Sequence, residues 1–360
     1  MSARMNTPDI LPLVERIGEE PTAALIGLIT GAVFGVAAQR SRFCLRAAAV
    51  SFARGLWDDK LAVWLLTFST AVVWVQSATL AGLFRPEEAR MMSVSGSWSG
   101  AILGGLMFGV GMVLARGCSG RLLVLAATGN LRSVISGLIF AVVAQMSLHG
   151  YLAPLRDRLA GLWITPGGRN INLIEAFALP DWSGLALGVF SAFVALAVAR
   201  KNRIGAARLV FGAGVGFSVA LGWVLTFTLS QVAFEPVSIA SATFTGPSAT
   251  TLMFVLDTSK LLEFDVGLVP GVFLGSFLAS FWAGEFKFEG FENEANMRRA
   301  MTGAVLMGFG GMLAGGCAIG NGVTGGSIFA ATAWLALLCM WIGAIITDFL
   351  VDQKGALATA

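Results

Sequence analysis

Two ten-residue stretches of this chain share a pattern of small residues that ends in a cysteine. The stretch at Gly109–Cys118 reads GVGMVLARGC, and the stretch at Gly308–Cys317 reads GFGGMLAGGC. Six of these ten positions are identical when the chain is shifted by 199 residues, which exceeds what glycine richness alone would usually give. Because self-similarity at a fixed spacing is typical of repeated structural units, the match predicts an internal repeat of about half the chain.

Composition indicates the fold class. Hydrophobic residues make up 56% of the 360 residues and charged residues only 12%, whereas soluble domains carry about 25% charged residues. This excludes an ordinary soluble enzyme and a nucleic-acid-binding protein. The apolar stretches are long and continuous rather than alternating, which favours membrane-spanning helices over a β-barrel. We therefore predict an all-α polytopic membrane protein, in which many of the 45 glycines serve close helix packing.

Hydropathy predicts about nine membrane crossings and four shorter re-entrant half-helices. The crossings are expected at 22–38, 61–83, 99–115, 131–150, 182–199, 208–230, 266–284, 300–314 and 333–351. The half-helices are expected at 41–53, 119–129, 236–260 and 318–331. The whole of 1–360 is then one membrane domain, with repeat halves at about 20–150 and 205–351 joined by a linker helix at 182–199. The first half is expected to cross the membrane four times, and the linker helix crosses it once more. Because five crossings then precede the second half, and five is an odd number, the second half is expected to be inverted in the membrane.

Lysine and arginine residues predict the orientation. Placing the loop Arg200–Arg208 in the cytoplasm puts 16 of them inside and 8 outside, and the opposite orientation reverses that ratio. Cytoplasmic loops of membrane proteins carry the excess of positive residues. We therefore expect a bacterial inner-membrane protein with a periplasmic N-terminus and a cytoplasmic C-terminus.

Three of the four cysteines lie where a predicted crossing ends and a half-helix begins. These are Cys44, Cys118 and Cys317, whereas Cys339 lies inside a crossing and is expected to be ordinary packing. Helix N-termini present free N–H groups and favour anions. The inverted counterpart of Cys44 is expected near 234–247, where there is no cysteine. Sharp turns beside the cysteines are allowed by glycine, here Gly117, Gly120, Gly315, Gly316 and Gly320.

Each of these features also has a plainer interpretation. A buried cysteine is usually an inert small hydrophobe. The arginines near the cysteines are explained either as positive-inside anchors or as an electropositive vestibule for an anion, formed by Arg42, Arg46, Arg116 and Arg121.

Carboxylates inside the predicted crossings are sparse, which argues against a carboxylate proton relay. The candidates for proton handling are Glu175, Glu235 and Asp348, the last close to the end of a crossing. A solvated outer loop is expected to contain Asp257, Lys260, Glu263 and Asp265.

The cysteine motifs together resemble the YeeE/YedE family of bacterial inner-membrane sulfur-compound transporters. The motifs are Arg-x-x-Phe-Cys at 40–44, Gly-Cys-Ser-Gly at 117–120 and Gly-Gly-Cys-Ala-x-Gly at 315–320. The resemblance implies thiosulfate uptake through a pseudo-twofold, hourglass-shaped protein whose re-entrant loops meet near the midplane. It also implies that Cys44, Cys118 and Cys317 form the path. Some relatives work beside a small TusA-like sulfurtransferase, which here would be a separate cytoplasmic polypeptide.

We therefore expect a transporter rather than an enzyme, surrounded by membrane lipids, with no cofactor, metal or nucleic acid. Three alternatives stay open. The substrate could be another sulfur or selenium species. A membrane thiol oxidoreductase would need two cysteines with Cα atoms within about 7 Å, and no cofactor motif accompanies them. A soft-metal site is conceivable because three thiolates suit Cu(I).

Overall fold

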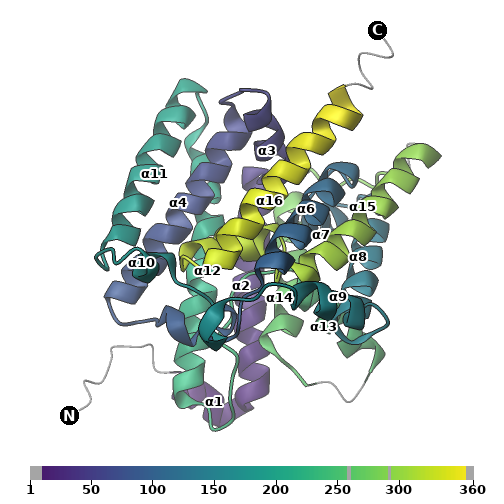
Figure 1. The fold of residues 1–360 in the computed structure, drawn as a ribbon. Coiled ribbons are helices and arrows are strands. Elements are labelled where there is room, and N and C mark those ends of the chain that lie inside the picture. Colours follow the sequence, from purple (N-terminus) through teal and green to yellow (C-terminus); the bar gives the residue numbers. More distant parts are fainter. Residues whose placement is uncertain (1–9, 258–260, 291–292, 354–360) are drawn as a thin grey trace.

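A computed structural model describes residues 10–257, 261–290 and 293–353 of this chain, and these residues form a bundle of helices (Figure 1). Helices α2 and α14 run side by side through the middle of the bundle. Helices α4 and α11 pack together at one side, and α8 and α15 at the other. The described residues contain no strand, only isolated bridges such as that between Asn172 and Ala330. The predicted all-α architecture is therefore confirmed.

Nine helices among the described residues are long. They are α2 (Glu19–Ser41), α4 (Asp59–Leu80), α6 (Trp98–Leu114), α8 (Leu131–His149), α11 (Ser183–Lys201), α12 (Ala206–Val232), α14 (Phe264–Trp282), α15 (Glu294–Leu313) and α16 (Ala331–Thr347). The shorter ones are α1 (Leu11–Ile17), α3 (Leu45–Ala53), α5 (Arg90–Ser93), α7 (Ser119–Ala127), α9 (Ala153–Ala160), α10 (Leu173–Ala176) and α13 (Thr245–Leu256). Two π-helical segments follow, at Gly320–Gly325 and Asp348–Gln353.

Eight helical segments of the described chain are long and apolar enough to cross a membrane, against the nine crossings predicted. The difference is α15, which contains the predicted crossing at 300–314 but lies outside this set. Its first two turns carry Glu294, Arg298 and Arg299, which make the helix as a whole more polar. It still packs between α6 and α8.

Glycines bring α2 and α14 into direct backbone contact. A Cβ atom at Gly27 or Gly31 would overlap a backbone oxygen of α14, and a Cβ atom at Gly267 or Gly271 would overlap one of α2. Small residues that allow such close approach are typical of membrane helix pairs, where van der Waals packing replaces the hydrophobic effect. The prediction that glycines serve close helix packing is confirmed for this helix pair.

A buried ion pair connects α3 to the end of α16. The Asp348 side chain is only 1% exposed and accepts hydrogen bonds from Arg54 Nε at 3.0 Å and Nη2 at 2.8 Å. Arg54 directly follows α3, whose first residue comes after Cys44. The pair therefore holds the helix that begins at Cys44 against α16.

We expect Arg54→Gln to destabilise the protein by about 2–4 kcal/mol. Removing one partner of a buried pair leaves the other charge uncompensated, at a cost of about 3–5 kcal/mol. The Arg54 side chain is 41% exposed, so solvent screening reduces this value. Thermal unfolding in detergent measures the effect. The control is Arg298→Gln, because Arg298 and its partner Glu294 are 74% and 80% exposed. Equal effects of the two substitutions would contradict the prediction.

Candidate functional site

Four helical segments begin close together in the interior, and three of them begin directly after a cysteine. Cys44 is the residue before α3, Cys118 the residue before α7, and Cys317 the residue before the helical segment 318–327. The fourth, α13, follows Phe244. A Cβ atom at Gly120 in α7 would lie 3.1 Å from the Phe244 ring and 3.4 Å from the Ile319 side chain, so these three segments touch.

Backbone amides of neighbouring segments surround the Cys317 sulfur. The Phe244 N–H donates to Cys317 Sγ at 3.2 Å and the Gly320 N–H at 3.4 Å, and Thr243 Oγ1 lies 3.8 Å from the same sulfur. Cys317 is fully buried. The sulfur therefore accepts two N–H groups, and in its contact with Thr243 either group could be the donor.

Cys118 has an equivalent environment in the first half of the chain. Its thiol is 1% exposed and hydrogen-bonds with the backbone groups of Leu45 and Arg121. Cys44 and Cys317 are both close enough to Cys118 to interact with it electrostatically. The structure thus brings together the three cysteines that the sequence singled out, with Cys44 half-buried. All four cysteines are free, and Cys339 packs in α16 against Gly105 of α6.

The glycines beside these cysteines have distinct roles. Gly315 takes a left-handed conformation with φ of 75°, and Gly316 packs against the side chain of Asn321. At the matching place in the first half, Arg116 takes the same left-handed conformation with φ of 57°, and Gly117 follows it. Gly320 leaves no room for a Cβ atom beside the Thr243 hydroxyl.

The four arginines expected to form an anion vestibule differ in exposure and in their partners. Arg42 is exposed and pairs with Glu285 at 3.5 Å, and Arg116 is exposed and donates to Asn296 at 3.4 Å. Arg46 is half-buried in the first turn of α3. Arg121 in α7 is half-buried, and its Nη1 is a buried donor without a hydrogen-bond partner. Arg121 therefore has a buried donor three residues from Cys118.

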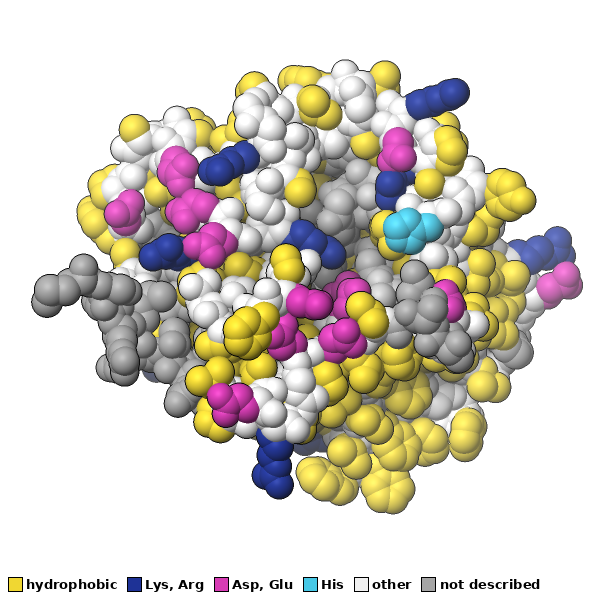
Figure 2. Space-filling view, turned by 90° about the horizontal axis from the view of Figure 1, so that it is seen from below, with side chains coloured by type: hydrophobic (Ala, Val, Ile, Leu, Met, Phe, Trp, Pro, Cys, Tyr) yellow, Lys and Arg dark blue, Asp and Glu magenta, His cyan; other side chains and the backbone are white. Residues whose placement is uncertain are grey.

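A cavity of about 230 Å³ is lined by residues on both sides of Cys317 in the sequence, among them Gly315 and Gly320, and we call it the Thr243 cavity. Arg90 lies at this cavity, and Thr243 and Gly320 are among its lining residues. Arg90 also lines a neighbouring cavity of about 200 Å³ that is rich in carboxylates, which we call the acidic cavity. Figure 2 shows acidic side chains gathered on this face, around a hollow in the surface.

The acidic cavity corrects one prediction. Asp265, expected in a solvated loop, is only 7% exposed and lies in the first turn of α14, where it lines this cavity. Glu263 lines it too and is exposed as expected, and Lys260 lies outside the described residues. Glu175 and Glu235 are exposed, and Asp348 is paired with Arg54. The burial of Asp265 could not be predicted from the sequence, because it is the last of four charged residues between 257 and 265. A run of charged residues like this is typical of a solvated loop.

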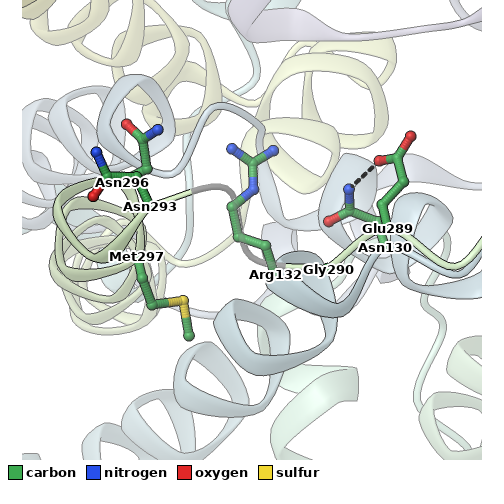
Figure 3. A pocket seen from close by; sticks show the side chains of 7 residues that line it. All are labelled: Asn130, Arg132, Glu289, Gly290, Asn293, Asn296 and Met297. Atoms are coloured by element: carbon green, nitrogen blue, oxygen red, sulfur yellow. Dashed lines mark hydrogen bonds between the residues drawn. The ribbon is translucent and has the colours of Figure 1, made fainter.

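A third cavity, of about 460 Å³, was not anticipated from the sequence. It lies between the start of α8 and the start of α15, and Figure 3 shows Arg132 between Asn293 and Asn296 on one side and the Asn130–Glu289 pair on the other. Asn130 Nδ2 donates to Glu289 at 2.6 Å. No cysteine lines this cavity. Within the described residues, no group of three or more His, Cys, Asp or Glu side chains could hold a metal ion.

Comparisons with known proteins agree on one family. Residues 40–346 match the model of the family described as Sulphur transport. The chain is 28% identical to the thiosulfate transporter TsuA of Escherichia coli, over 93% of this chain and 98% of that protein. It is 26% identical to the thiosulfate transporter TsuA of Spirochaeta thermophila, over 88% of this chain and 96% of that protein. The chain also matches the probable transporter YedE of Escherichia coli over a shorter stretch, with 32% identity over 24% of this chain and 22% of that protein.

Proposed function

The chain belongs to the Sulphur transport family of multi-pass membrane proteins, and on that premise we propose that it carries thiosulfate inward across the bacterial inner membrane. The path runs past Cys44, Cys118 and Cys317. The observation that carries this proposal is the meeting of four helix N-termini around two buried cysteines. Arg121, with its unpartnered donor beside Cys118, adds positive charge near the path.

The chemistry of these groups suits thiosulfate, a dianion with one soft sulfur and three hard oxygens. Helix N-termini supply positive potential without a fixed cation that would trap the ion. A neutral thiol is a weak S–H donor that can contact the soft sulfur. Cys317 Sγ accepts two backbone N–H groups, and in this proposal its own proton turns from Thr243 Oγ1, 3.8 Å away, to the sulfur of the passing ion. Weak contacts in series favour release as well as binding.

Matching contacts in the two halves support an inverted repeat of 20–150 and 205–351, joined by a linker helix at 182–199. Shifting by 199 residues places Leu45, Cys118 and Arg121 on Phe244, Cys317 and Gly320. The first set contains a buried sulfur and its two backbone partners, and so does the second. In this proposal α3, α7, α13 and the segment 318–327 are the four re-entrant half-helices.

Growth on thiosulfate as the only sulfur source tests the proposed function. Cells that lack other thiosulfate uptake routes should grow when this chain is expressed and should accumulate sulfur from labelled thiosulfate. Growth on thiosulfate no better than that of cells with an empty vector, with the protein present in the membrane, would refute the proposal. Other sulfur or selenium species would be sought as competitors in the same cells. A separate TusA-like sulfurtransferase is the partner we propose for the cytoplasmic face.

The excess of positive residues gives a prediction of orientation. We expect the loop Arg200–Arg208 and the C-terminus in the cytoplasm, because 16 of the 24 lysine and arginine residues then lie inside. Fusions of alkaline phosphatase and of a fluorescent protein to the C-terminus measure this, since the first is active only in the periplasm and the second fluoresces in the cytoplasm. An active phosphatase fusion without fluorescence of the other would contradict the prediction.

A further inference from the structure

Most polar side chains that line the Thr243 cavity already donate their hydrogen bonds to the protein. Ser241 Oγ donates to the Val219 carbonyl at 2.6 Å, and Asn321 Nδ2 donates to the Gly316 carbonyl at 2.7 Å. Thr324 donates to the Ala242 carbonyl in the same way. These groups shape the cavity, but their protons are not available to a ligand.

Trp223 differs from these side chains because its donor has no hydrogen-bond partner among the described residues. It lines the same cavity from α12, is 2% exposed, and its ring stacks on Phe84 with centroids 5.2 Å apart. Its Nε1 is a buried donor without a hydrogen-bond partner among the described residues. Buried donors without partners are rare and call for an explanation, and a ligand that accepts this N–H would provide one.

Thr243 separates this cavity from Cys317. It lines the cavity, and its hydroxyl lies 3.8 Å from Cys317 Sγ. Gly320 lines the cavity beside it, and a Cβ atom at Gly320 would overlap the Thr243 hydroxyl. An ion that reaches Cys317 from this cavity therefore passes the Thr243 side chain.

We propose that Trp223 and Thr243 bind the oxygen atoms of the transported anion and turn its soft sulfur toward Cys317. This inference rests on the proposed function and adds a specificity-determining pair to it. The indole N–H and the hydroxyl are hard donors, which suit sulfonate oxygens. The sulfur of Cys317, just behind Thr243, suits the terminal sulfur. Both donors are neutral, so the ion is oriented and then released, while Arg90 attracts it at the cavity.

In the proposed repeat, Thr243 occupies the position that is equivalent to Cys44. Shifting Cys44 by 199 residues places it on Thr243, the counterpart that was expected near 234–247. The path then has a thiol at this position in one half and a hydroxyl in the other. This difference makes the two ends of the path chemically distinct, with the oxygen-binding end at the Thr243 cavity.

The test uses Trp223→Phe, which keeps the stacked ring, and Thr243→Val, which keeps the side-chain shape. Thiosulfate binding to the purified protein and the concentration dependence of uptake are measured for each. A hydrogen bond to a charged partner contributes enough that each loss should weaken binding about 10- to 100-fold. The half-saturating concentration should rise by the same factor while the maximal rate persists. Thr243→Ser, which keeps the hydroxyl, should bind like the unaltered protein.

The matched control is Trp334→Phe. Trp334 also has a buried Nε1 without a partner, but it lines a different, largely apolar cavity, so its replacement should leave affinity unchanged. Unaltered affinity in both Trp223→Phe and Thr243→Val would overturn the inference, and so would a lower maximal rate at unchanged half-saturation. If the unaltered protein binds thiosulfate through this pair but does not transport it, the proposed function fails and the inference stands. If it binds no thiosulfate, both fail.

Discussion

Replacing Cys317 or Cys118 with alanine is expected to reduce thiosulfate uptake to background, whereas replacing Cys339 with alanine is expected to leave it unchanged. Cys317 is buried where α13 and the segment 318–327 begin, and its sulfur holds two backbone N–H groups. Alanine removes that acceptor and also the Cys317 thiol that a passing sulfur would contact. Cys339 packs in the middle of α16, away from any helix N-terminus.

Cys44→Ala extends this prediction to the half-buried member of the three. It too should lose uptake, since it lies at the start of α3 and within electrostatic range of Cys118. Uptake of labelled thiosulfate is measured for all four alanine variants, with membrane levels compared by immunoblot. Near-normal uptake by two of the three path variants, at normal membrane levels, would contradict the cysteine path.

The family and the positions of the three cysteines could be predicted from the sequence because both depend on short local patterns. Gly-Cys-Ser-Gly and Gly-Gly-Cys-Ala-x-Gly are contiguous, and the predicted resemblance is confirmed by the match over residues 40–346. The helix that follows each cysteine is likewise a local property. The cysteines could therefore be placed at helix starts before their neighbours were known.

The proposed oxygen-binding pair could not be predicted, because it depends on which neighbours the two side chains have in three dimensions. Trp223 resembles any other tryptophan of an apolar helix, and only the structure shows that its Nε1 lacks a partner. Thr243 comes from another segment and becomes notable through its distance to Cys317. The arginine vestibule stays a prediction, and the contacts of its arginines could not be predicted either. Arg42 and Arg116 have partners far along the chain, Glu285 and Asn296, which no local pattern indicates.

The structure also changes which carboxylate could accompany an anion. Glu175 and Glu235 are exposed, and Asp348 is engaged by Arg54. Asp265 is buried in the first turn of a spanning helix and lines the acidic cavity together with Arg90. Arg90 in turn lines the Thr243 cavity. A test of proton coupling should therefore begin with Asp265.

Thiosulfate passage through the purified protein is expected to be electrogenic and passive. Moving two negative charges inward against a potential of about 100 mV, negative inside, costs about 4.6 kcal/mol. At equilibrium a passive path would then hold internal thiosulfate about 10³-fold below the external concentration. Uptake still proceeds where the cell consumes the ion as it arrives. We favour this mechanism because the described carboxylates in spanning helices are few, and Asp348 among them is paired.

Liposomes containing the protein decide between passive and proton-coupled passage. Uptake of labelled thiosulfate is followed under an imposed potential without a pH gradient, and under a pH gradient without a potential. An inside-positive potential should speed uptake and an inside-negative one should slow it, while the pH gradient alone should produce no accumulation. Asp265→Asn should behave like the unaltered protein, because a passive path needs no proton acceptor. Accumulation above the external concentration under a proton gradient alone would refute passive passage. Loss of that accumulation in Asp265→Asn, with potential-driven uptake retained, would then identify Asp265 as the group that carries the proton.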